Sequence, residues 1–264
     1  MNEAGAGLVL VDKEAGPSSF SVVRRVGHAH GLKAGHAGTL DPFATGLLVC
    51  LLGRATRLAR YLVGLDKRYV VTIRLGLRTS TGDVEGEETE STPVPGEEEI
   101  LSLRGEVELP VPAASAVKID GERAYRLHRR GVVVEMPTRR STVHALEILR
   151  YEPPEVVLDL HVSSGTYVRS IAACLGGHCT ALRRTAVGQL LVDEADEAHL
   201  RPPLDALSHL PHLALSAEEE RLVRTGRSLN GHAAHGAVAL VRDGVLVGVG
   251  RAEGGLVRPE TVIA

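Results

Sequence analysis

The stretch Gly35-His36-Ala37-Gly38-Thr39-Leu40-Asp41-Pro42-Phe43-Ala44-Thr45-Gly46 places one carboxylate in a glycine-punctuated loop, directly before the apolar run 47–52. Proline at the next position disfavours helical dihedrals at Asp41, so we expect an extended conformation there. The glycines permit turns or the close approach of another molecule. Asp-Pro is also a common turn signal, and in isolation a helix cap or an Asx-turn is the default interpretation of Asp41. The rest of the chain has to decide between a structural and a chemical role.

The segments on both sides of this loop predict strands and a helix. Residues 7–12 form a short apolar strand pattern, and the turn that follows predicts a helix start at Ser18-Ser19. The run 47–52, ended by a glycine, is too short for a typical helix and predicts a buried strand. The helix is expected to carry Phe20, Val23 and Val26 on one side.

Further along the chain, strand patterns predominate. Tyr69 begins an alternation of apolar and polar residues that predicts a strand with one buried face. Segments 142–151 and 156–162 are also strand-like, with a Pro-Pro turn between them. A Ser-Ser-Gly-Thr sequence then caps a helix that begins near Tyr167, which places Arg169 in the first turn.

A boundary near residue 210 divides the chain into two expected domains. Prolines between residues 202 and 211 give a linker-like composition. The segment 238–247 that follows is a hairpin pattern with Asp243-Gly244 at its turn. We therefore expect a catalytic domain over residues 1–210 and a small β-rich domain over residues 211–264.

Composition places the chain among ordinary soluble proteins. It has 264 residues, of which 44% are hydrophobic, and no apolar run reaches the roughly 18 residues that a membrane helix needs. We expect a cytoplasmic protein without a membrane association. Cys50, Cys174 and Cys179 are too few for a disulfide framework, and each is expected to be a free buried thiol. The cluster of Cys174, His178 and Cys179 lacks a second ligand pair at suitable spacing, so we expect packing and no metal site.

The net charge of −3 hides a segregation of charges. Acidic residues concentrate over 83–99 among small polar residues, which predicts a solvated excursion. Basic residues cluster at several places, listed here: Arg24-Arg25, Arg54/Arg57/Arg60, Lys67-Arg68, Arg123/Arg126/Arg129/Arg130, Arg139-Arg140 and Arg183-Arg184. Such clusters form a phosphate-binding face only if the fold brings them together; otherwise each is an ordinary exposed surface.

Seven motifs follow one another along the chain. They are Gly7-Leu8-Val9-Leu10-Val11-Asp12-Lys13, Gly35 to Pro42, Lys67-Arg68-Tyr69, Thr79-Ser80-Thr81-Gly82-Asp83, Ser115 to Gly121 with Ala124-Tyr125, Ser164 to Ser170, and Leu182-Arg183-Arg184-Thr185 ahead of Gly188. In this order the motifs resemble those of bacterial tRNA pseudouridine synthases of the TruB type. The resemblance spans nearly the whole chain, and the ordered series is more specific than any one motif.

The resemblance implies an isomerase that acts on the T-loop uridine of tRNA, position 55. Such an enzyme breaks the N-glycosidic bond, turns the base and rejoins it through carbon 5. This chemistry needs a nucleophilic carboxylate, a held base and exclusion of water, but neither a metal nor an organic cofactor. The implied partner is the T-arm of tRNA, and we expect a monomer without an obligate protein partner.

Pattern and resemblance together predict an α+β fold. Its central sheet is mixed and largely antiparallel, with flanking helices and a cleft that receives the RNA. The C-terminal part is compatible with the small PUA-like, RNA-binding β domain that family members append.

The resemblance also assigns roles to individual residues. Asp41 corresponds to the nucleophilic aspartate, which can attack carbon 6 of the base or carbon 1′ of the ribose; the sequence leaves both routes open. Arg169 corresponds to the arginine that pairs with this aspartate and stabilises its ionised form. Tyr69 corresponds to the tyrosine that stacks on the uracil, a contact worth roughly 1 to 3 kcal/mol.

Four more residues correspond to positions around the RNA. His36 matches a histidine that enters the space left by flipped bases, and Asp83 matches a residue that contacts displaced nucleotides. Tyr167 and Leu182 match positions around the target uridine, although core packing accounts for Leu182 almost equally well.

Two other functions remain to be distinguished from the isomerase. A catalytically silent tRNA-binding or tRNA-folding protein would use the same base-binding residues, but it would not need Asp41, Tyr69 and Arg169 together. A carboxylate-dependent nucleoside hydrolase would normally need a second carboxylate as general acid, and no similar glycine-framed motif supplies one.

Overall fold

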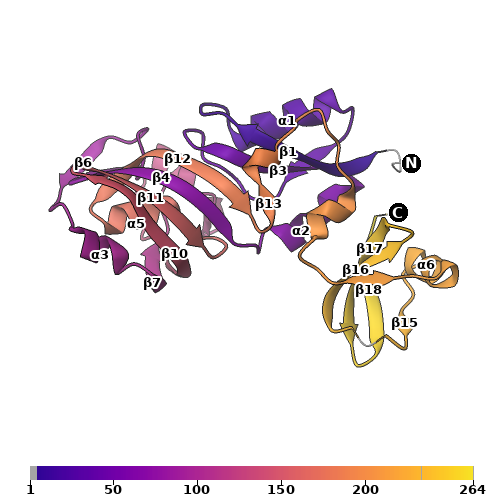
Figure 1. The fold of residues 1–264 in the computed structure, drawn as a ribbon. Helices are drawn as coiled ribbons and strands as arrows, with labels where there is room; N and C mark the ends of the chain where they lie inside the picture. The colour runs from indigo at the N-terminus through magenta and orange to yellow at the C-terminus, as the bar shows by residue number, and fades with distance from the viewer. Residues whose placement is uncertain (1–4, 233, 264) are drawn as a thin grey trace.

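The structure is a computed structural model that describes residues 5–232 and 234–263. The main sheet has nine strands: β1 Ala6–Lys13, β2 Ala34–His36, β3 Thr45–Gly53, β4 Lys67–Leu75, β7 Gly105–Pro110, β10 Thr138–Glu152, β11 Glu155–Val162, β12 Gly177–Val187 and β13 Leu190–Leu191. Their order is β1-β3-β12-β4-β11-β10-β7, with β2 beside β3 and β13 beside β12 (Figure 1). The β3–β12 pair is parallel and the other pairs are antiparallel.

Helices are a minority of the chain. They are α1 Ser19–Ala29, α2 Ala59–Leu62, α3 Glu97–Leu101, α4 Ala124–Arg129, α5 Val168–Cys174 and α6 Ala217–Arg224, with short 3₁₀ turns η1 Arg54–Leu58, η2 Val192–Glu194 and η3 Pro203–Leu207. Two separate hairpins pair β5 Leu77–Thr79 with β6 Glu88–Ser91 and β8 Lys118–Ile119 with β9 Glu122–Arg123. The predicted α+β fold with a mixed, largely antiparallel sheet is confirmed.

Strand β3 is buried on both of its faces, as its uninterrupted apolar run predicted. Leu48 and Leu52 belong to the hydrophobic cluster that also holds the buried residues of α1 and α5. Leu47 and Leu51 face the opposite way, into a second cluster with Leu58 and other residues of η1 and α2. The strand that follows the Asp41 loop is therefore fixed from two sides.

Helix α1 begins as predicted and buries Val23 and Val26 on one side, but not Phe20. The hydroxyl of Ser18 accepts a hydrogen bond from the Ser21 N–H and so caps the helix. The buried stripe contains Ser19, Val22, Val23 and Val26, whereas Phe20 is 67% exposed. The prediction that Phe20 shares the buried side is wrong, because the stripe starts one residue earlier, at Ser19.

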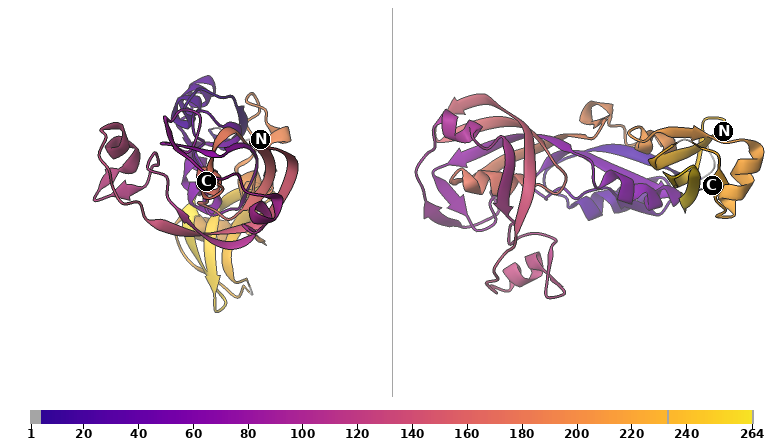
Figure 2. Two further views of the ribbon diagram at one scale, coloured as in Figure 1. Left: turned by 90° about the vertical axis from the view of Figure 1, so that its left-hand side faces the viewer. Right: turned by 90° about the horizontal axis from the view of Figure 1, so that it is seen from below.

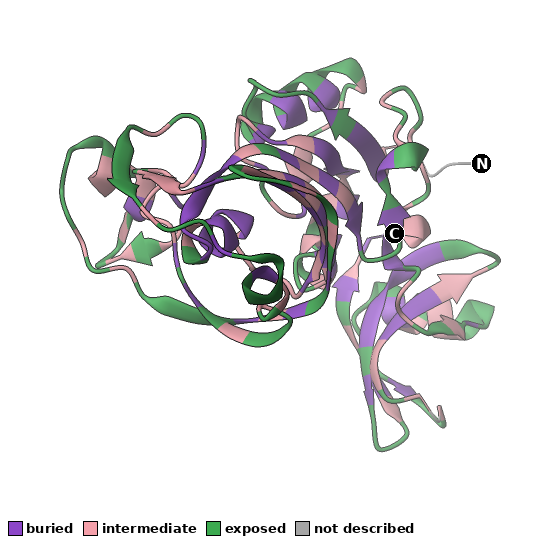
Figure 3. Ribbon diagram, turned by 60° about the vertical axis from the view of Figure 1, so that its left-hand side comes forward, coloured by how far each residue is buried: buried purple, intermediate pink, exposed green. Residues whose placement is uncertain are grey.

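The half of the sheet that contains β4, β11 and β10 curls around buried helical structure (Figure 3). Five of the seven residues of α5 are buried there, including Arg169. The excursion 112–137 between β7 and β10, which carries β8, β9 and α4, protrudes from the body of the molecule (Figure 2). The start of this excursion contacts α5, because the Ala114 carbonyl accepts a hydrogen bond from Arg169.

The C-terminal strands form a sheet of their own. Its order is β14-β16-β17-β18-β15, with bounds β14 His212–Ala214, β15 Leu229–Asn230, β16 Gly236–Arg242, β17 Val245–Glu253 and β18 Leu256–Val262. The Asp243-Gly244 turn joins β16 to β17, as the hairpin pattern indicated. Leu246 and Val249 share a hydrophobic cluster with Leu207 and with residues of β1 and β3. The domain boundary near residue 210 stays a prediction.

None of the helices in the described ranges is long and apolar enough to cross a bilayer.

Candidate active site

The Asp41 loop connects β2 to β3 and is tied to the start of α1. The Ser19 hydroxyl donates to the Leu40 carbonyl and accepts from the Leu40 N–H, both at 2.8 Å. The Asp41 main chain closes a turn, since its carbonyl accepts from the Ala44 N–H at 3.1 Å. Its carboxylate is not used for that turn and is 34% exposed. Asp41 therefore has both the turn role and a side chain available for chemistry.

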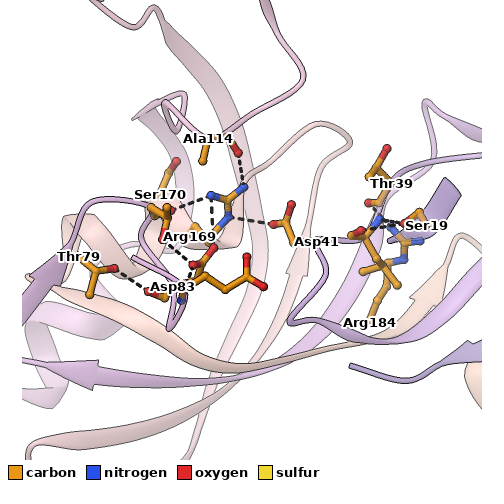
Figure 4. Close-up of polar contacts among 12 residues, drawn as sticks. Ser19, Thr39, Asp41, Thr79, Asp83, Ala114, Arg169, Ser170 and Arg184 are labelled. Carbon is orange, nitrogen blue, oxygen red and sulfur yellow. Dashed lines mark hydrogen bonds and ion pairs between the residues drawn. The ribbon is translucent and has the colours of Figure 1, made fainter. Parts of the chain in front are cut away.

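Arg169 holds the Asp41 carboxylate from a buried position on α5. Its Nε lies 2.9 Å from Asp41 Oδ2, and its own side chain is only 4% exposed. The other guanidinium nitrogens donate to the carbonyls of Thr81, at 2.7 Å, and Ala114, at 3.0 Å (Figure 4). Three chain segments distant in sequence therefore fix the plane of this guanidinium, which gives the Asp41 carboxylate one orientation.

Asp83 is a second carboxylate beside the same guanidinium. Its Oδ2 lies 3.6 Å from Arg169 Nη1, and its side chain is 5% exposed. The other oxygen, Oδ1, accepts hydrogen bonds from the Thr81 hydroxyl at 2.5 Å and from the Glu85 N–H at 3.0 Å. Asp83 thus lies behind Arg169 and stabilises its charge, while an RNA contact by Asp83 stays a prediction.

Tyr69 and Leu182 come from neighbouring strands and face the same side of the sheet. Tyr69 in β4 is 8% exposed and is paired in register with Arg184 of β12. Leu182, two residues earlier in β12, is 6% exposed and belongs with Tyr69 to the cluster that contains α5. Tyr167, half-buried, immediately precedes α5. The same cluster contains Leu40, which precedes Asp41, and Val168, which precedes Arg169.

His36 ends β2 at the entry to the loop and is half-buried. Its Nδ1 is buried without a hydrogen-bond partner in the described part of the chain. Burial, and then the positive charge of Arg184, lower the pKa of His36. The neutral imidazole is therefore favoured at this position.

The three thiols do not form a site. Cys50 and Cys179 are buried as predicted, and burial raises the pKa of Cys50 to about 12. Cys174 is exposed at the end of α5, so the prediction that it is buried is wrong. Within residues 5–232 and 234–263, no group of three or more His, Cys, Asp or Glu residues is arranged to hold a metal ion.

The expected basic pair at Arg183 and Arg184 is split by the alternation of β12. Arg183 forms a two-pronged pair with Asp12, at 2.9 and 2.7 Å, and is 41% exposed. Arg184 points to the opposite face and is 1% exposed. Neither of the two interpretations of this cluster, a phosphate-binding face or an ordinary exposed surface, applies to Arg184, because a strand directs successive side chains to opposite faces.

Comparison with known proteins identifies the family. Residues 24–168 match the model of the TruB family pseudouridylate synthase (N terminal domain). The chain belongs to the TruB family of pseudouridylate synthases. The matched range contains Asp41, Tyr69 and Asp83 and ends one residue before Arg169.

Individual relatives cover most of this TruB-family chain. It is 44% identical to the tRNA pseudouridine synthase B of Mycobacterium sp. (strain KMS), over 83% of this chain and 77% of that protein. It is 41% identical to the tRNA pseudouridine synthase B of Parasynechococcus marenigrum (strain WH8102), over 97% of both chains. Among solved structures, a chain of a Cbf5-Nop10-Gar1 complex gives a TM-score of 0.73 at 25% identity, covering 98% of this chain and 85% of that one.

Sequence reasoning missed two groups of this TruB-family site. The carbonyls of Thr81 and Ala114 orient Arg169, yet no side-chain pattern announces a main-chain acceptor. Lys13, 1% exposed at the end of β1, donates to the carbonyls of Pro42 at 3.1 Å and Ala44 at 2.6 Å. The position of Lys13 at the end of a buried apolar strand could have indicated that it binds main-chain carbonyls, since a buried cation needs acceptors.

Proposed function

We propose that this chain converts the uridine at position 55 in the T-loop of tRNA to pseudouridine, with Asp41 as the nucleophile. The observation that carries the proposal is the Asp41–Arg169 pair, in which a buried guanidinium holds a carboxylate that is still one-third exposed. An ionised, oriented and accessible carboxylate is what covalent catalysis requires.

The reaction conserves all atoms of the nucleotide. The bond between N1 and C1′ breaks, the base turns while it is held, and a bond forms between C5 and C1′. The hydrogen on C5 leaves as a proton, and N1 gains a proton. Two routes are compatible with this outcome: attack by Asp41 on C6 of the base, and attack by Asp41 on C1′ of the ribose.

Other residues of the site would hold the substrate. Tyr69 offers an aromatic plane on which an extruded uracil can stack, which compensates for part of the stacking lost in the RNA. Leu182 and Tyr167 would border the base, and His36, favoured as a neutral ring, would contact the RNA loop. Asp83 is buried and hydrogen-bonded to Thr81, so it would contact displaced nucleotides only if the segment around Thr81 moved with it.

The test of this proposal uses purified protein and an unmodified tRNA transcript labelled with tritium at C5 of uridine, with no added cofactor and no other protein. We expect tritium release into water and pseudouridine at one position. A transcript with cytidine at position 55 is the control and should release nothing from that site. The same experiment tests whether the chain works without an obligate protein partner, and size-exclusion chromatography of the same protein tests whether it is a monomer.

Two results would support the other functions. Release of free uracil without pseudouridine would indicate the nucleoside hydrolase. Tight binding of the transcript with neither tritium release nor free uracil would indicate the silent tRNA-binding or tRNA-folding protein.

Binding of tRNA should weaken steeply as salt rises. Arg123, Arg126, Arg129 and Arg130 are exposed on the protruding excursion, and Arg139 is exposed next to it. Because phosphate contacts release counterions, we expect the affinity to fall by on the order of 10²-fold or more between about 50 and about 200 mM salt. Filter binding at several salt concentrations measures this, and a flat response would contradict a phosphate-binding face.

A further inference from the structure

Arg184 is a buried cation whose hydrogen bonds all go to main-chain carbonyls. It donates through Nε to the Leu47 carbonyl at 2.8 Å, through Nη1 to Thr39 at 3.3 Å and through Nη2 to Gly38 at 3.1 Å (Figure 4). Among the residues that the structure describes, no carboxylate forms an ion pair with it. A charge buried at 1% exposure is costly unless its donors are satisfied, so these three carbonyls are what keeps Arg184 in place.

The carbonyls that Arg184 contacts lie on both sides of Asp41 in the sequence. In the sheet, Arg184 is paired with Gly46 of β3 and with Tyr69 of β4. The main chains approach so closely that a Cβ at Gly46, which has φ of +97°, would lie 2.2 Å from the Arg184 carbonyl oxygen. Arg184 therefore connects the strand that carries Tyr69 to the loop that carries Asp41.

The carbonyls of Leu40, Asp41, Pro42 and Ala44 accept from other groups. Leu40 is held by the Ser19 hydroxyl, while the Pro42 carbonyl accepts from Lys13 and, at 2.8 Å, from the Gly16 N–H. Lys13 thus holds the arm of the loop after Asp41. Among the described residues, only Arg184 supplies side-chain donors to the carbonyls of Gly38 and Thr39, the arm before Asp41.

We propose that Arg184 is a positioning residue, whose guanidinium holds the backbone at Gly38 and Thr39 so that the Asp41 carboxylate meets the target uridine. The proposal rests on the proposed function of Asp41. A misplacement of about 1 Å at a reacting group costs on the order of 10²-fold in rate, and a rigid two-armed loop prevents it.

A purely structural arginine makes different predictions. If Arg184 only stabilised the core, its loss would lower the free energy of unfolding, but each folded molecule would react at the normal rate. A positioning residue instead lowers the rate of bound substrate and loosens one particular loop. The rate of the chemical step, the affinity for tRNA and the mobility of residues 37–45 therefore have to be measured separately.

The experiment compares Arg184→Met, Arg184→Lys and the control Arg150→Met, which removes an exposed arginine that pairs with Glu152 and Glu155 and belongs to none of the basic clusters. For Arg184→Met we expect a single-turnover rate at saturating enzyme lower by about 10²-fold or more. Its Kd for tRNA should stay within about threefold of the unaltered protein, which is well under 1 kcal/mol. Arg184→Lys keeps the positive charge but not the planar guanidinium with its several donors, and its single-turnover rate should fall about tenfold. The control should keep its rate.

Hydrogen exchange of the free proteins gives a readout that needs no activity. The amides of Leu40 and Ala44 are hydrogen-bonded within or next to the loop, to the Ser19 hydroxyl and the Asp41 carbonyl. In Arg184→Met, residues 37–45 should exchange faster, while β3 and β12 stay protected. Unchanged exchange in this segment would overturn the proposal even if the unaltered protein proved inactive on tRNA.

Two kinetic results would also overturn it. One is an Arg184→Met protein that reacts at the normal rate per folded molecule. The other applies if Arg184→Met does not fold. An Arg184→Lys protein with the normal rate and normal hydrogen exchange would show that the guanidinium contacts to the three carbonyls are not needed.

Discussion

Replacement of Asp41 by asparagine should reduce the conversion of uridine by more than about 10⁴-fold, because an amide cannot act as the nucleophile. Asparagine has nearly the same shape, and its amide oxygen can still accept the 2.9 Å hydrogen bond from Arg169 Nε. The fold and the affinity for tRNA should therefore remain. Tritium release under single-turnover conditions and filter binding of the same tRNA measure the two effects.

Matched variants make this result specific. Asp12→Asn removes a carboxylate that also pairs with an arginine, Arg183, but lies on the other side of the sheet, and it should keep its rate. Because an asparagine can deamidate back to aspartate, Asp41→Ala should show the same loss. Conversion by Asp41→Ala at a rate within tenfold of normal would refute the nucleophilic role.

Loss of the Arg169 charge should damage both stability and activity. In Arg169→Met, Asp83 stays buried at 5% exposure without its cation, and breaking a buried pair in this way costs about 3 to 5 kcal/mol. Conversion should fall as well, by on the order of 10²-fold or more, because the Asp41 carboxylate loses its orientation. Urea unfolding and single-turnover kinetics measure the two losses.

Two comparisons test the cause of that loss. Arg183→Met breaks a 41%-exposed pair and should change the free energy of unfolding by no more than about 1 kcal/mol. Adding Asp83→Asn to Arg169→Met should recover part of the lost stability, because the unpaired buried charge is removed. If Arg169→Met is too unstable to study, Arg169→Lys replaces it, and no loss of conversion in either variant would contradict the pairing with Asp41.

The sequence predicted the strands more reliably than the details of the site. Apolar runs such as 47–52 specify burial by themselves, and β3 lies where this run predicted it. The family resemblance, and not residue type alone, indicated that Arg169 pairs with Asp41, and the structure places Arg169 Nε 2.9 Å from Asp41 Oδ2. The prediction failed for Phe20 because one position along α1 separates the buried stripe from the exposed face.

Main-chain contacts account for most of what was missed. The carbonyls of Gly38, Thr39, Thr81 and Ala114 carry no mark in the sequence, yet they hold Arg184 and Arg169. The sequence also does not distinguish an arginine that binds phosphates from one that donates to main-chain carbonyls. Only the direction of its strand face decided that Arg184 is buried and Arg183 is not.

The position of β12 in the sheet has a consequence for the order of assembly during synthesis. Strands β1 and β3 can pair soon after they leave the ribosome, and β4, β11, β10 and β7 can pair among themselves. These two groups are joined only when β12, at residues 177–187, inserts between β3 and β4. Contacts between segments so far apart in sequence form late, because a large loop must close first. A nascent chain therefore completes its main sheet, and the Arg184 contacts to the Asp41 loop, only after residues 177–187 have left the ribosome.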